Sequence, residues 1–115
     1  MKQKILELLK EKHEINMTDF HKFIPEIKGE YAMFMPVNPG INPNILWLSS
    51  VTQDFILAFN QLLIDEKLID WRPTDIKCYI FDNSPIYDMK LCQRKDIKKQ
   101  NKCWLPIVIT QKQIQ

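Results

Sequence analysis

The feature that most constrains this chain is an apolar stripe with helical spacing near its middle. Four apolar residues recur at intervals of three and four positions: Phe55, Ala58, Phe59 and Leu62. Such a stripe lies on one face of a helix and packs against a core. Ser50 and Gln53 have the spacing of a capping box, in which each side chain bonds a backbone N–H of the first turn. The sequence therefore predicts a helix that begins after Ser50 and continues to about Asp65.

The segments on either side predict two more helices and several short strands. Charged and apolar residues alternate with helical spacing over residues 2–12, which is typical of an amphipathic helix. Thr18 is a candidate cap for a second, short helix that ends before Pro25. Pro106 interrupts the last apolar run and predicts an edge position for that strand. Apolar or alternating runs predict strands at residues 31–35, 45–48, 68–71, 76–81, 86–92 and 104–109.

Two stretches predict loops. The first, residues 36–44, is called the proline loop here; it contains Pro36, Pro39 and Pro43, a density that neither a helix nor a strand accommodates. The second, residues 93–102, is polar and rich in lysine, and is called the basic loop. No linker or repeat divides the chain, so residues 1–115 are expected to form a single domain with one core.

The order of these segments resembles the winged helix-turn-helix superfamily. The residues that carry the resemblance run from Ser50-Val51-Thr52 to Leu68-Ile69 and look like a third helix followed by the turn into the first wing strand. The match covers residues 2–92, with two departures: an insert at 30–48, and Lys67 in place of a turn glycine. The resemblance implies a compact domain that binds DNA or docks on a protein. The expected fold is α+β and winged-helix-like, with N-terminal helices and one long capped helix on a small antiparallel sheet.

Glycine and cysteine usage excludes several kinds of site. The chain has two glycines, far apart, which excludes the glycine-rich loops that cradle phosphate. The three cysteines, Cys78, Cys92 and Cys103, lack C-x-x-C spacing, so we expect free thiols, no metal site and a reducing compartment. No segment approaches the ~20 apolar residues of a membrane span. The prediction is a cytoplasmic protein with no cofactor and no membrane contact.

Charge is unevenly distributed along the chain. No lysine or arginine occurs from Glu30 to Glu66, whereas seven lysines and arginines follow Ile86 against two aspartates. A helix that reads DNA presents cations to phosphates, and the helix predicted after Ser50 has none. Nucleic-acid contact is therefore expected only through five cations of the basic loop, which bind phosphate without regard to sequence. These are Arg94, Lys95, Lys98, Lys99 and Lys102.

Catalytic patterns are weak in this sequence. Asp75-Ile76-Lys77, with Asp65 or Asp70 upstream, fits the acid and acid-x-lysine pattern of a metal-dependent nuclease, provided that it lies on a strand. His13 and His21 do not share a helix face as metal-binding pairs do. We interpret the chain as non-enzymatic, with no catalytic residues, and keep the nuclease as the most remote alternative.

The leading hypothesis is a small adaptor, regulator or inhibitor that docks on another protein. Its composition, rich in lysine, isoleucine and asparagine, is typical of an AT-rich bacterial or phage genome. A stiff proline loop without nearby cations favours a protein partner over phosphate. Nucleic-acid binding by the basic loop is the alternative. The expected protein contacts are Tyr31, Met33, Met35, Pro39, Ile41, Asn42 and Trp47.

Overall fold

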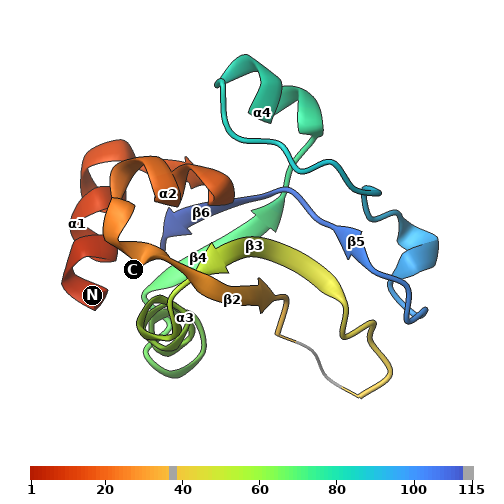
Figure 1. Ribbon diagram of the computed structural model, residues 1–115. Helices are drawn as coiled ribbons and strands as arrows, with labels where there is room; N and C mark the ends of the chain where they lie inside the picture. Colours follow the sequence, from red (N-terminus) through yellow and green to blue (C-terminus); the bar gives the residue numbers. More distant parts are fainter. Residues whose placement is uncertain (37–38, 113–115) are drawn as a thin grey trace.

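A computed structural model of the chain describes residues 1–36 and 39–112, which form helices and two three-stranded sheets (Figure 1). The predicted α+β class is confirmed. The helices are α1 (Lys2–Lys12), α2 (Phe20–Phe23), α3 (Gln53–Asn60), which continues as a π-helical turn over Gln61–Asp65, and α4 (Ile76–Phe81). The strands are β1 (Glu14–Asn16), β2 (Lys28–Phe34), β3 (Ile45–Val51), β4 (Ile69–Pro73), β5 (Cys103–Trp104) and β6 (Ile107–Gln111). Short 3-10 turns cover Met17–Asp19, Pro25–Ile27 and Arg94–Asp96.

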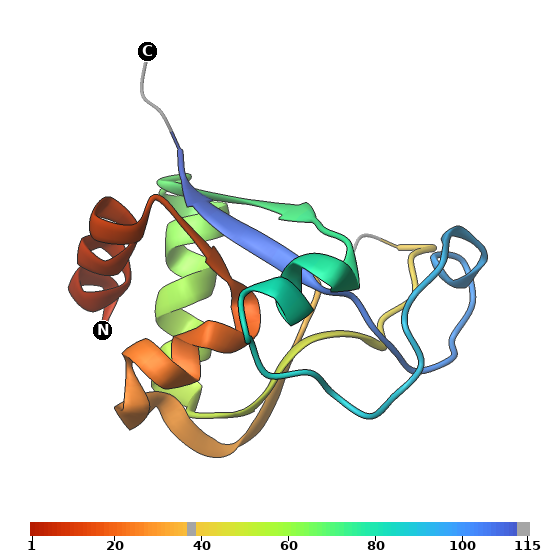
Figure 2. The ribbon, with the colours of Figure 1, turned by 90° about the horizontal axis from the view of Figure 1, so that it is seen from above.

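The two sheets have different strand directions. The first has the order β1-β6-β4 and is antiparallel throughout, with Ile109 of β6 opposite Ile15 on one side and Trp71 on the other. The second has the order β2-β3-β5, where β2 and β3 are antiparallel and β5 runs parallel to β3. The two strands that flank the proline loop, β2 and β3, thus pair with one another, and they lie where strands were predicted. Figure 2 shows β4 and β6 beside one another, with α3 behind them.

The apolar stripe of α3 lies in the core that the two sheets share. Its four residues are buried, as the spacing predicted. Phe59 contacts Trp47 of β3 and Phe20 of α2, with ring centroids 6.2 Å away in each case. Burial of a phenylalanine side chain contributes about 1.5–3 kcal/mol to folding. This helix therefore holds α2 and β3 in place.

The cap of α3 differs from the sequence prediction. Thr52, not Ser50, is the N-cap, and its hydroxyl accepts a hydrogen bond from the Phe55 N–H at 3.2 Å. Ser50 still belongs to β3 and has a positive φ of 60°. The capping box predicted for Ser50 and Gln53 is therefore wrong. The helix begins two residues later than predicted, and threonine caps a helix almost as well as serine.

The N-terminal helices follow the prediction in position but not in capping. The first helix is confirmed over Lys2–Lys12, with Ile5 and Leu9 buried. The second helix is short, as Pro25 predicted. Thr18 does not cap it: the Thr18 hydroxyl donates to the carbonyl of Pro85 at 2.8 Å, which ties this helix to the chain after α4.

Residues 76–81 form a helix, so the predicted strand there is wrong. Asp75 caps α4 by accepting from the Lys77 N–H at 2.9 Å. Tyr79 is the buried residue of α4, and its hydroxyl donates to the carbonyl of Ile107 at 2.6 Å and accepts from the Met17 N–H at 2.9 Å. Burial raises the pKa of the Tyr79 phenol, which stays neutral and acts as both donor and acceptor. A short apolar run does not by itself distinguish strand from helix.

The last two predicted strands also change. Residues 86–92 form no strand; a single bridge joins Leu91 to Trp104, although Tyr87 and Met89 are half-buried between exposed neighbours. The run 104–109 divides at Pro106 into β5 and β6, because proline lacks the N–H that a continuous ladder needs. The predicted edge position is wrong for residues 107–109, which belong to β6, the central strand of its sheet.

Within residues 1–36 and 39–112, no helix combines the length and the apolar composition needed to cross a membrane.

Candidate functional site

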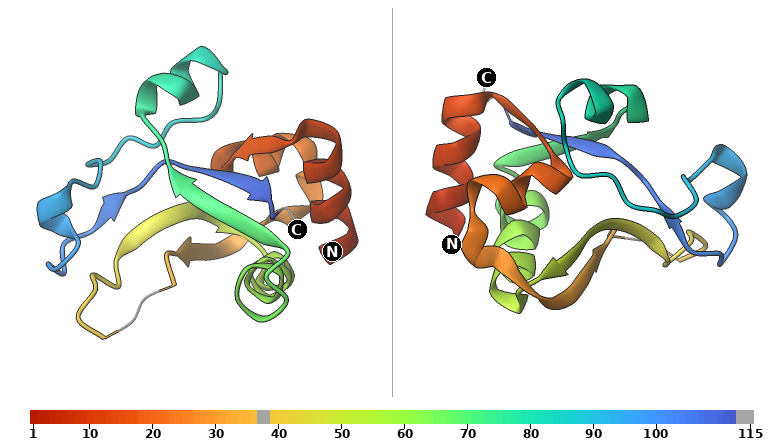
Figure 3. Two further views of the ribbon diagram at one scale, coloured as in Figure 1. Left: turned by 180° about the vertical axis from the view of Figure 1, so that it is seen from behind. Right: turned by 45° about the horizontal axis from the view of Figure 1, so that its top comes forward.

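Residues 39–44 of the proline loop lie against the basic loop at the end of the molecule opposite α1 and α2 (Figures 1 and 3), whereas residues 37 and 38 of that loop lie outside the described residues. Asn42 of the proline loop is the centre of this contact and is buried. Its backbone N–H donates to the carbonyl of Ile97 at 2.6 Å. Its side-chain amide donates to the carbonyls of Asp96 at 3.0 Å and Asn101 at 2.8 Å. Asn42 therefore donates three hydrogen bonds to backbone carbonyls of the basic loop and joins the two loops.

Asn44 makes a second set of contacts between the two loops. Its side-chain amide donates to the carbonyl of Gln100 at 2.6 Å, and its own carbonyl accepts from the Cys103 N–H at 3.3 Å. The Asn44 N–H donates to the Asn42 side-chain oxygen at 2.8 Å, which closes an Asx turn. Hydrogen bonds thus hold the end of the proline loop from Asn42 to Asn44 against the basic loop.

Asp96 organises the basic loop from its interior. This carboxylate is buried and accepts from the Gln93 N–H at 2.8 Å, the Asn101 side-chain amide at 2.8 Å and Lys90 Nζ at 3.1 Å. The bonds from Asn101 and Gln93, together with the Lys90 charge, lower the pKa of Asp96 to about 2 despite its burial. Asp96 is therefore ionised at neutral pH, and its negative charge holds the loop together.

A disulfide between Cys92 and Cys103 closes the base of the basic loop. The expectation of three free thiols is therefore wrong for these two residues, whose Cα atoms lie 5.0 Å apart. Spacing along the chain gave no sign of the pairing, because β5 brings Cys103 back to Cys92 only in the folded structure. Cys78 is a free, exposed cysteine on α4.

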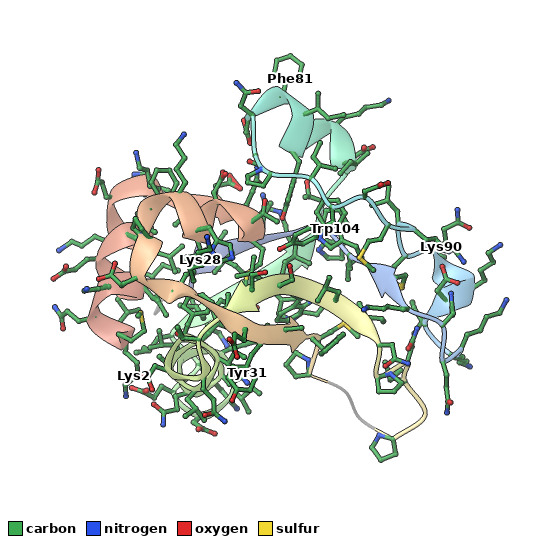
Figure 4. All side chains as sticks on the ribbon, in the orientation of Figure 1. Lys2, Lys28, Tyr31, Phe81, Lys90 and Trp104 are labelled. Carbon is green, nitrogen blue, oxygen red and sulfur yellow. A yellow bond between two sulfur atoms is a disulfide. The ribbon has the colours of Figure 1, made fainter. Side chains whose placement is uncertain are left out.

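The five predicted phosphate-binding cations are all exposed on this closed loop: Arg94, Lys95, Lys98, Lys99 and Lys102. Among the described residues, none of the five is in an ion pair; the neighbouring Lys90 is the cation bound to Asp96. Figure 4 shows nitrogen-tipped side chains projecting outward beside Lys90. Like charges held close together repel one another, and an anionic partner would relieve that repulsion.

The predicted protein contacts are dispersed by the fold. Met33 and Trp47 belong to the core, so a partner cannot contact them at the surface. Asn42 also drops out, because it is buried and its polar groups bind the basic loop. Met35 and Ile41 are half-buried. The exposed members are Tyr31, with 52 % of its surface accessible, and Pro39.

The contact between the loops also removes the electrostatic argument for protein docking. The proline loop has no cation of its own, but Asn42 and Asn44 hold it against residues 96–101, which include two lysines. The surface around the proline loop therefore includes cations of the basic loop, although the proline loop itself has none. An anionic partner on the basic loop would lie next to the proline loop as well.

The remaining candidate sites are also placed by the structure. Asp75 caps α4 and Lys77 lies in its first turn, so these residues are not on the strand that the nuclease hypothesis requires. Nε2 of His21 lies 2.9 Å from the carbonyl of Ser49, a contact that positions α2 on β3. Across residues 1–36 and 39–112, no three His, Cys, Asp or Glu side chains are arranged to hold a metal ion.

One exposed apolar feature, away from the two loops, was missed by reasoning from the sequence. Phe81 and Ile80 of α4 expose 92 % and 60 % of their surface. The strand predicted for residues 76–81 gave no reason to expect this exposure. The interior of the basic loop was readable in part: Gln93 and Asp96 have capping-box spacing, and each side chain does bond the backbone of the other.

Comparison with protein-family models, curated protein sequences and solved structures finds no match for this chain.

Proposed function

We propose that the protein is a non-enzymatic, winged-helix-like binding module that holds the phosphate backbone of nucleic acid with its basic loop. The observation that carries the proposal is the ordered state of that loop: Asp96, Asn42 and the disulfide fix it from inside while its five cations point outward. A loop ordered before binding loses little conformational entropy when it binds.

The arrangement of the elements supports the winged-helix part of the proposal. Three helices precede β4, and β4 pairs with β6 in an antiparallel sheet, as the resemblance leads us to expect. Lys67, at the turn from α3 into β4, has a positive φ of 54°, in the position where the superfamily has a glycine. Glycine adopts this conformation without strain, which accounts for the family preference.

The chemistry of the surface defines the kind of contact. From Gln53 to Glu66 there is no cation and there are three carboxylates, so α3 does not enter a DNA groove. The basic loop has no aromatic residue on which an unpaired base could stack. The proposed contact is therefore with the phosphates of a duplex, independent of sequence.

Fluorescence anisotropy with a duplex of mixed sequence tests this proposal. Replacing Arg94, Lys95, Lys98 and Lys99 by alanine should abolish most of the binding. The slope of log K against log salt should become shallower by about 0.9 for each lost phosphate contact. The matched control replaces four exposed lysines elsewhere, Lys10, Lys22, Lys28 and Lys77, and removes the same charge. Equal losses in the two variants would mean that net charge alone, and not the basic loop, attracts the duplex.

Protein docking is the second candidate, favoured by the exposure of Phe81. Phe81, with 92 % of its surface in solvent on a short helix, is the side chain that would insert into an apolar pocket of a partner. In this case the partner captured from a lysate should survive nuclease treatment, be lost with Phe81→Asp and be retained by the basic-loop variant. Loss of the captured material on nuclease treatment would instead favour nucleic acid.

A further inference from the structure

The disulfide encloses the basic loop and little else. Cys92 and Cys103 directly flank residues 93–102, and every cation of the proposed phosphate contact lies between them. Cys103 belongs to the two-residue strand β5, and the Cys103 N–H donates to the carbonyl of Asn44. The disulfide therefore closes the basic loop at the point where this loop meets the proline loop.

We propose that the Cys92–Cys103 pair is a redox switch that sets the order of the basic loop. The loop is ordered when the two cysteines are joined and opens when they are reduced. The consequence for binding rests on the function proposed above: the oxidised protein holds phosphate and the reduced protein holds it weakly.

The loop, and not the core, responds to reduction because of where the cysteines lie. The main hydrophobic cluster, formed by residues from α1 to α3 and the strands, contains neither Cys92 nor Cys103, although Cys103 is itself fully buried in β5. Without the disulfide, the loop depends on polar contacts around Asn42 and Asp96, each of which contributes modestly. Reduction returns chain entropy to the opened loop, and repulsion among its lysines favours the open form.

The chemical step is thiol–disulfide exchange with a small disulfide such as oxidised glutathione. The thiolate of Cys92, which is half-buried, attacks one sulfur of the small disulfide, forms a mixed disulfide and releases one thiol. The thiolate of Cys103 then attacks the Cys92 sulfur, forms the intramolecular bond and releases the second thiol. The protein loses two electrons and two protons, and the small disulfide becomes two thiols. Reduction is the reverse, with an excess of dithiol.

The experiment compares oxidised and reduced protein in a Cys78→Ser background, which removes the exposed free thiol. Alkylation and mass measurement should count no free thiols before, and two after, treatment with dithiothreitol. Trypsin then reports loop order directly, because five of its cleavage sites lie between the two cysteines. We expect cleavage there to become at least about tenfold faster on reduction, with little change at Lys10 and Lys22.

Binding is measured on the same two samples. If about one reduced molecule in ten keeps the ordered loop, its apparent affinity for the duplex falls about tenfold. The double variant Cys92→Ala/Cys103→Ala should behave as the reduced protein and ignore dithiothreitol. Re-oxidation of the unsubstituted pair should restore both slow cleavage and tight binding, which excludes damage to the fold.

The outcomes separate the two proposals. Loop cleavage that is equally slow in both forms, or a disulfide that dithiothreitol does not reduce in the folded protein, would overturn the switch. Cleavage that rises on reduction while neither form binds the duplex would support the switch and refute the nucleic-acid function. Tighter binding by the reduced form would also overturn the switch.

Discussion

Replacing Asn42 by alanine would test whether the proline loop and the basic loop act as one body. The substitution removes three side-chain hydrogen bonds: two donated to the carbonyls of Asp96 and Asn101, and one accepted from the Asn44 N–H. The Asp96 carbonyl is buried and would keep only the Lys99 N–H, at 3.2 Å, as a donor, so the loss of this bond costs about 1 kcal/mol. The other two groups are half-buried, so water restores part of their bonding. We expect a total loss of about 2–4 kcal/mol.

Urea unfolding of the oxidised protein would measure this loss, and tryptic cleavage within residues 93–102 would localise it. The matched control is Gln100→Ala, which shortens an exposed side chain in the same loop and should change stability by less than about 0.5 kcal/mol. Asn42→Ala removes no charge, yet we expect it to weaken duplex binding because it disorders the cations. An unfolding free energy and a duplex affinity equal to those of the control would refute the joined-loop interpretation.

Three further predictions concern the fold and its pH dependence. Thr52→Ala should lower the urea unfolding free energy by about 1 kcal/mol through the lost cap of α3, whereas Ser50→Ala should not lose a cap; a larger effect at Ser50 would contradict this assignment. Tyr79→Phe should lower the unfolding free energy by about 1–3 kcal/mol in the same assay, because the Met17 N–H and the backbone N–H and carbonyl of Ile107 lose their bonds to the phenol. An unchanged urea midpoint would rule out that network. Because the folded pKa of Asp96 is lowered to about 2, its contribution to loop order is complete above the ordinary carboxyl pKa of about 3.9 and disappears as the pH falls through about 2. Amide NMR signals of residues 93–102 should lose dispersion over that interval, and Asp96→Asn should lack the transition.

The sequence by itself determined the elements whose signal is local and long. The stripe from Phe55 to Leu62 repeats over several turns, so no other backbone conformation buries all of it, and α3 lies where the spacing predicted. The same reasoning located α1, the pair β2 and β3 and the loop between them. Boundaries were less certain, since Ser50 and Thr52 are both good caps and only packing at the end of β3 selects between them.

Tertiary structure decided the short elements and every contact between distant segments. The run 76–81 is apolar enough for a strand, but the Asp75 cap and the single inward side chain of Tyr79 make it a helix. Phe81 is exposed for the same reason. Such a run is too short for periodicity to distinguish the two conformations.

The candidate site shows the same division. The five cations of the basic loop were evident from composition, because charged side chains remain at the surface in almost any fold. Their organisation was not, because it depends on Asn42 and Asp96, polar residues that a sequence places in solvent by default. Burial of these two residues is stable only because each finds partners more than two residues away along the chain. The partners of Asp96 lie within six residues along the chain, but those of Asn42 lie 54 and 59 residues away. The partners of Asn42, like the partner of Cys92, come within reach only once β5 has returned beside β3.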